Sequence, residues 1–190
     1  PDLAEAYVSL AMVEYLFQYD WKKAEEHFRR ALELRPSYST GHHWFGLFLA
    51  MHDRTSEALN HLSQAKELDP LSSSINTDLA FAYYLANQTD KSIEQLNKTL
   101  RSDPDFANAH NLLGMNYVAE KRFDAAILEF EKASQLSDGR LGSTELVWAN
   151  GFSGDKAKAE QLLAAFPKEK KISPFDMAVI FTSLGEKEKA

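Results

Sequence analysis

The 190-residue sequence contains no cysteine, which excludes disulfides, thiolate metal ligands and cysteine nucleophiles together. It also lacks any apolar run near the ~18 residues of a membrane-spanning helix, so we expect no membrane insertion. The N-terminal stretch PDLAEAYVSL lacks the charged-then-apolar layout of a secretion signal. These absences are compatible with a cytoplasmic protein, which is the location we expect.

Basic charge is also scarce. The chain has 21 Lys and Arg against 28 Asp and Glu, giving a net charge of −7. The basic residues Lys168, Lys170 and Lys171 are interrupted by Glu169, and we interpret them as part of a solvated linker. Binding to nucleic acid depends on counterion release by clustered Lys and Arg. We therefore expect no nucleic-acid binding by this segment.

Residues able to hold a metal or to catalyse a reaction are present but poorly arranged. Adjacent histidines such as His42 and His43 point about 100° apart on a helix, which is unsuited to shared ligation. The carboxylates Glu25-Glu26 and Glu129/Glu131 lie among Lys and Arg, which is typical of a solvated helix face rather than of an acid–base pair across a cleft. We predict no metal, no cofactor and no catalytic residue.

What the sequence does contain is a 34-residue period. The stretch 105–138 has the pattern of two amphipathic helices joined by a short polar turn, and its key residues recur upstream at the same step. The recurring sets are Phe28, Leu62, Leu96 and Phe130; Ala24, Ala58, Ser92 and Ala126; Gly46, Ala80 and Gly114; and Pro36, Pro70 and Pro104. A period kept over four copies indicates a repeat protein. The small residues are predicted to lie where two helices cross closely.

This period and pattern resemble the tetratricopeptide repeat. The resemblance implies an all-α fold, a right-handed α-solenoid of stacked antiparallel helix pairs whose first helices line a concave groove for a peptide or partner protein. We expect a single array over residues 1–190. Its repeats are predicted at about 1–36, 37–70, 71–104 and 105–138, with a degenerate repeat at 139–167 and a truncated one at 172–190.

The pattern also predicts the individual helices. The first four pairs are expected at 2–18 and 21–34, 38–51 and 55–68, 72–86 and 89–102, and within 105–138. A fifth pair is expected at 141–152 and 155–166, with Ala159 and Leu163 in the Ala and Phe roles, and a last first-helix at 173–184. Repeat one has one residue more than repeat four, which we place in the turn around Gln18–Asp20. Because Ala190 falls inside an expected helix, we expect the chain to be a segment of a longer protein, and the apolar helix 173–184 to favour end-to-end self-association.

By repeat position, fifteen residues of the central first helices should face the groove, and none of them carries a fixed charge. From these we predict partner binding by His43, Leu47, Met51, Thr77, Phe81, Tyr84, Asn108, Asn111 and Met115. The Lys/Asn/Lys/Arg clamp of co-chaperones is missing, because its first two positions carry Val8/Met12, His43/Leu47, Thr77/Phe81 and Asn111/Met115. The asparagine ladder of sugar-transferase arrays is missing too, since its position carries Ser9, Trp44, Asp78 and Leu112.

Two stretches, Tyr19-Asp20-Trp21 and Ser173-Pro174, are similar to arrays of bacterial signalling and transcription regulators. The resemblance thus implies a non-catalytic interaction scaffold, part of a larger regulatory protein. Two alternatives stay open. In the first alternative, the segment is the substrate-recruiting region of an enzyme whose catalytic domain lies outside this chain. In the second, it is a self-association module.

Overall fold

The computed structural model describes residues 3–167, 171–186 and 188. In these residues the chain forms eleven α-helices, one π-helical turn and no strand. The elements are α1 (Ala4–Val13), the π turn η1 (Glu14–Gln18), α2 (Trp21–Leu34), α3 (Ser39–Met51), α4 (Thr55–Leu68), α5 (Ser73–Leu85), α6 (Thr89–Ser102), α7 (Ala107–Ala119), α8 (Phe123–Leu136), α9 (Ser143–Ser153), α10 (Lys156–Ala164) and α11 (Pro174–Leu184). The predicted helices are confirmed to within about two residues at each end, as far as the described residues reach. Lys168, Lys170 and Ala190, to which parts of the sequence interpretation refer, lie outside them.

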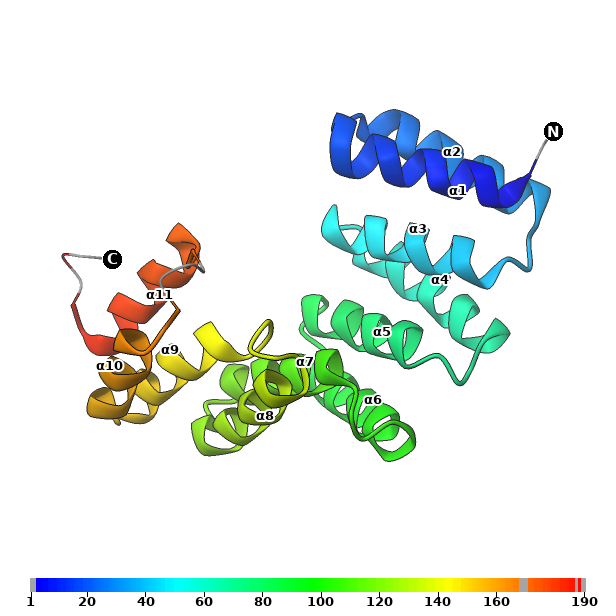
Figure 1. Ribbon diagram of the computed structural model, residues 1–190. Coiled ribbons are helices and arrows are strands. Elements are labelled where there is room, and N and C mark those ends of the chain that lie inside the picture. Colours follow the sequence, from blue (N-terminus) through cyan, green and yellow to red (C-terminus); the bar gives the residue numbers. More distant parts are fainter. Residues whose placement is uncertain (1–2, 168–170, 187, 189–190) are drawn as a thin grey trace. The chain divides into compact units, whose positions relative to one another are not determined.

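The chain folds as two compact units, Pro1–Gln95 and Leu96–Ala190, and the boundary falls within α6. In the first unit, α1 packs on α2, α3 on α4, and α4 on α5, while the first helices α1, α3 and α5 also contact one another in that order (Figure 1). In the second unit, α7 packs on α8, α8 on α9, and both α10 and α11 on α9. The predicted all-α architecture of stacked helix pairs is confirmed.

The turn inside each regular pair has the same backbone geometry. One residue per repeat is left-handed, and these residues keep the 34-residue step: Tyr19 (φ 56°), Asp53 (φ 59°), Asn87 (φ 56°) and Lys121 (φ 59°). In three of the turns the following amide donates back across the helix end, from Arg54 N to Leu49 O (3.0 Å), Gln88 N to Tyr83 O (2.9 Å) and Arg122 N to Tyr117 O (2.8 Å). This is the bond pattern that closes helix C-termini through a left-handed residue. The repeat thus fixes the turn as well as the helices.

Repeat one departs from this geometry before its turn. There the amide of Asp20 donates to the carbonyl of Glu14 (3.0 Å), a longer step than in the other turns, because the last helical turn is π-helical. A π turn holds one residue more than an α turn. Since Tyr19 already keeps the step to Asp53, the extra residue lies in Glu14–Gln18. The sequence prediction, which placed it around Gln18–Asp20, put it slightly too late in the chain.

The small residues of the period lie at close helix crossings, as predicted. A Cβ added to Gly46 would lie 2.7 Å from Leu62 Cγ, and one added to Gly114 would lie 2.5 Å from Phe130 Cε1. Leu62 and Phe130 are themselves fully buried. Glycine costs a helix about 0.5–1 kcal/mol relative to alanine, and the approach of the two helices explains why it is used here.

The fifth pair is the irregular part of the second unit. Gly142 and Gly154, at the two ends of α9, are both left-handed. In α10, Ala159 is fully buried while Leu163 is half-buried, so Ala159 fills its predicted role and Leu163 does so in part. Helix α11 covers α9 through Ile180 and Leu184, whereas Phe175 near its start is 76% exposed. Among the residues that the structure describes, no helix combines the length and apolarity needed to cross a membrane.

Candidate functional site

A repeated polar pair joins the first and second helix of three consecutive repeats. The first-helix members are His42, Asn76 and His110; each bonds the carbonyl of the preceding repeat's proline, at 2.8 Å to Pro36, 2.9 Å to Pro70 and 2.9 Å to Pro104. Each also bonds a second-helix residue, in the pairs His42–His61 (2.9 Å), Asn76–Gln95 (2.8 Å) and His110–Glu129 (2.5 Å). Every pair is separated by 19 residues. The pairs tie the proline loops to the helix pair, which is a structural role.

These pairs and their neighbours show where two of the carboxylates and histidines singled out from the sequence lie. Glu129 is a correction, because its side chain is only 16% exposed and is bonded to His110, whereas the sequence interpretation placed it on a solvated face. His42 and His43 have different partners, since His43 bonds Asp78. In the part of the chain that the structure describes, no three His, Cys, Asp or Glu side chains are grouped to hold a metal ion.

The first-helix surface of the first unit contains a histidine–carboxylate hydrogen bond that the sequence interpretation missed. His43 Nε2 donates to Asp78 Oδ2 at 2.6 Å and joins α3 to α5. His43 is buried, and its ring stacks on Trp44 with centroids 5.2 Å apart. The two paired residues are 35 positions apart, one more than the period. A search for polar partners at the period plus one would have found them.

The other predicted residues of this surface differ in exposure. Met51 is 57% exposed, Leu47, Phe81 and Tyr84 are half-buried, and Thr77 is buried. Because α3 contacts α5, these residues lie on adjacent helices. Leu47, Met51, Phe81 and Tyr84 belong to the C-terminal halves of the two helices.

In the second unit the predicted residues lie on α7. Asn108 is exposed, and Asn111 and Met115 are half-buried. Asn111 occupies the repeat position of Thr77 and His43. Thr77 Oγ1 and Asn111 Oδ1 are both buried and have no hydrogen-bond partner among the described residues. Buried polar groups are usually paired, so these two oxygens are exceptions at equivalent positions of consecutive repeats.

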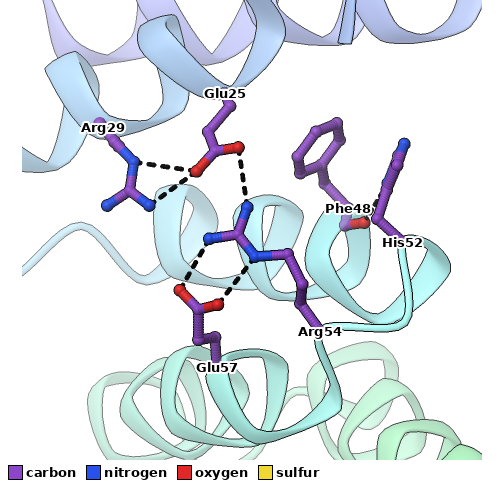
Figure 2. Close-up of polar contacts among 6 residues, drawn as sticks. All are labelled: Glu25, Arg29, Phe48, His52, Arg54 and Glu57. Atoms are coloured by element: carbon purple, nitrogen blue, oxygen red, sulfur yellow. Dashed lines mark hydrogen bonds and ion pairs between the residues drawn. The ribbon is translucent and has the colours of Figure 1, made fainter. Parts of the chain in front are cut away.

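A second polar cluster of the first unit lies between α2 and the start of α4. Arg54 donates from Nη1 to Glu25 (2.8 Å) and from Nε and Nη2 to the two carboxylate oxygens of Glu57 (2.7 and 2.8 Å). Arg29 donates to the other oxygen of Glu25, so Arg54 stands between two carboxylates of different helices (Figure 2). This network links consecutive second helices.

The protonation of this network is fixed by its hydrogen bonds. Partial burial alone would raise the pKa of Glu25, but hydrogen bonds from Arg54 and Arg29 outweigh it and hold that pKa below its usual range. The hydrogen bond from Arg54 likewise lowers the pKa of Glu57, and the pKa of Arg54 is raised by Glu57 and Glu25. An acid–base catalyst needs one carboxyl whose pKa is raised toward neutrality. These carboxylates stay charged, so they form a structural ion network.

The fold and its surfaces define the class as an α-helical repeat protein, in which helix pairs pack on their sequence neighbours. A family model described as tetratricopeptide repeat matches residues 49–115, and a second model with the same description matches residues 107–139. The chain is a tetratricopeptide repeat protein. Such repeats are generally non-catalytic modules for protein–protein interaction, so the chain is a scaffold that binds protein or peptide partners.

Solved structures agree with this fold. One, from a study described as functional characterization of Pseudomonas aeruginosa PilF, has a TM-score of 0.79 at 17% identity and covers 97% of this chain and 85% of its own. TTC0263, a thermophilic TPR protein of Thermus thermophilus, has a TM-score of 0.80 at 16% identity, with 95% and 98% covered. YrrB, described as a TPR protein with an unusual peptide-binding site, has a TM-score of 0.64 at 16% identity, with 98% and 93% covered. At these identities the likeness shows the fold alone. A search of the curated proteins found no match.

Proposed function

We propose that the first-helix surfaces of the two units bind a peptide or a segment of a partner protein. The observation that carries this proposal is the apolar surface of α3 and α5, where Met51, Leu47, Phe81 and Tyr84 are left partly or largely exposed on adjacent helices. Interface hot spots are typically aromatic side chains that become fully buried on binding, and Phe81 and Tyr84 are suited to that role.

The polar groups of the same repeat position support the proposal. The side-chain oxygens of Thr77 and Asn111 are buried beneath this surface, and neither has a hydrogen-bond partner among the described residues. Asn108 and Asn111 supply amides that both donate to and accept from a peptide backbone. Met115 adds an unbranched side chain that adapts to varied partners. The second unit's surface is thus suited to backbone recognition.

The test is a pull-down with the full chain, followed by mapping of the bound segment to a peptide. We expect Phe81→Ala to weaken binding of that peptide at least tenfold, about 1.4 kcal/mol. Leu71→Ala is the control, since Leu71 is an 86% exposed leucine in the loop before α5. If Phe81→Ala and Tyr84→Ala bind like the unchanged chain, the partner uses another face and this proposal is wrong.

A second candidate is self-association, which a different surface favours. Outside its buried face, α1 and the π turn expose Leu3, Leu10, Val13 and Phe17 at 56%, 49%, 43% and 76%. Their spacing of seven, three and four residues forms one apolar stripe along the helix. Light scattering across protein concentration tests it. A monomer at the highest concentration rules this candidate out.

We also propose that this chain is part of a larger regulatory protein. It is supported by the resemblance of Tyr19-Asp20-Trp21 and Ser173-Pro174 to arrays of bacterial regulators. The sequence of the full-length gene tests it, because a regulatory domain beside the repeats and a catalytic domain beside them are directly distinguishable.

A further inference from the structure

One residue supplies the fixed charge on the part of this surface formed by α3 and α5. Helices α3 and α5 together contain one acidic residue, Asp78, and no lysine or arginine. The side chain of Asp78 is 26% exposed, so its carboxylate is in contact with solvent at this surface. A single carboxylate on an otherwise uncharged surface attracts cationic groups without competition from neighbouring side chains of the same helices.

The carboxylate is held in a fixed orientation. Its Oδ2 accepts the 2.6 Å bond from His43, whose ring is buried and stacked on Trp44. In the described part of the chain, His43 is the hydrogen-bond donor to Asp78 and no second donor contacts the carboxylate. A carboxylate accepts about four hydrogen bonds, so most of its capacity remains for a donor from outside the protein.

Apolar side chains lie beside this carboxylate on both helices. Phe81 follows Asp78 by three residues and Leu47 follows His43 by four, which places each pair on one face of its helix. The His43–Asp78 bond brings the two faces together. A ligand that covers Leu47 and Phe81 would exclude water around Asp78. A charge-assisted hydrogen bond is stronger in such a desolvated setting than in water.

We propose that Asp78 is the specificity determinant of this surface and accepts a basic side chain, an arginine or a lysine, of the bound peptide. In this arrangement the apolar residues beside that basic side chain pack on Leu47 and Phe81. The inference rests on the proposed function and adds the ligand's chemistry to it. It also changes the expected salt response, because the uncharged surface anticipated from the sequence would lose less than about threefold in affinity between 50 and 500 mM salt.

The experiment starts by panning phage-displayed random dodecapeptides on the full chain. Affinities of the enriched synthetic peptides are then measured for the unchanged chain, Asp78→Asn, Phe81→Ala and Asp53→Asn. Asp78→Asn keeps the size of the side chain and an oxygen for His43, while Asp53→Asn makes the same charge change in an exposed turn whose left-handed backbone also suits asparagine. Thermal unfolding of each variant checks that it folds.

We expect the enriched peptides to carry Arg or Lys at a constant spacing from an apolar residue. Asp78→Asn should weaken them at least tenfold and Asp53→Asn less than twofold, and the unchanged chain should lose more than threefold between 50 and 500 mM salt. Peptides that lose affinity in Phe81→Ala but bind Asp78→Asn normally would overturn this inference and leave the proposed function intact. Both proposals are wrong if no peptide is enriched. They are also wrong if the enriched peptides bind Asp78→Asn and Phe81→Ala as tightly as they bind the unchanged chain.

Discussion

The pairs α3/α4 and α7/α8 lie 68 positions apart in the sequence and differ little in backbone, yet their polar side chains have diverged. Both have a glycine against a large buried residue, Gly46 with Leu62 and Gly114 with Phe130. Their equivalent polar pairs are chemically different, because His42 meets a second histidine whereas His110 meets a carboxylate. The steric part of the repeat is therefore kept, while the polar part is free to vary from one repeat to the next.

The same contrast holds at the ends of the turns. Arg54 bridges two carboxylates of different helices. The side chain of its equivalent Arg122 instead donates to the nearby Glu120, at 3.0 Å, and lies over the Tyr117 ring. A repeat position thus predicts where a side chain lies without predicting what it does.

The largest expected effect tests the steric half of this comparison. Gly114→Ala should destabilise the fold by about 1–3 kcal/mol, because the new Cβ would overlap the Phe130 ring. That ring has no room to move, since it is fully buried and packs edge-on against Trp148 with centroids 5.5 Å apart. Urea unfolding measures the change in unfolding free energy.

The control for this variant is a smaller partner. Phe130→Leu recreates the Gly46–Leu62 combination of repeat two and makes space for the added methyl group. The double variant Gly114→Ala/Phe130→Leu should therefore lose less stability than the sum of the two single variants. Strict additivity would show that the two residues do not interact, and that the close crossing is not the reason for glycine.

The second expected effect concerns the histidine pair of repeat two. Burial, followed by the neighbouring His42, lowers the pKa of His61 from 6.5 to about 4. Between these values the unfolded chain binds a proton that the folded chain does not, so the unfolding free energy falls as the pH drops from 6.5 to 4. We expect a loss of about 1–2 kcal/mol from this group, less than the full shift implies because the ring is partly exposed and screened by solvent.

Urea unfolding at several pH values checks this prediction, and the chain offers a matched replacement. Repeat three has Asn76 and Gln95 at the same positions, joined at 2.8 Å. The double variant His42→Asn/His61→Gln copies this uncharged pair and should flatten the pH dependence between 6.5 and 4. The same exchange at His110 and Glu129 should leave the contribution of His61 in place. An unchanged slope in the repeat-two variant would place the pH dependence elsewhere.

The smallest expected effect compares the two arginines. Arg54→Ala should cost about 1 kcal/mol, because it breaks hydrogen bonds to two carboxylates of different helices, and added salt should reduce that cost. Arg122→Ala should cost under about 0.5 kcal/mol, since exposed pairs of this kind contribute little. Thermal unfolding at low and high salt separates the two. Equal effects would mean that the bridge between α2 and α4 adds nothing.

The sequence by itself determined the helix pairs, their boundaries, and the small residues at the close crossings. These features follow from packing between consecutive helices, which repeats with the backbone and therefore leaves a period in the sequence. Asp53 and Lys121 show that even the left-handed turn residues keep this step, although their identities differ.

The tertiary structure alone decided which polar side chains meet. His43 and Asp78 lie on different helices, one residue off the period, and Glu129 looks like a surface carboxylate until its bond to His110 is seen. The π turn at Glu14–Gln18 was also placed only by the backbone. Such contacts depend on side-chain direction across two elements, which a one-dimensional period does not encode. On the proposed binding surface, the His43–Asp78 pair belongs to that second kind.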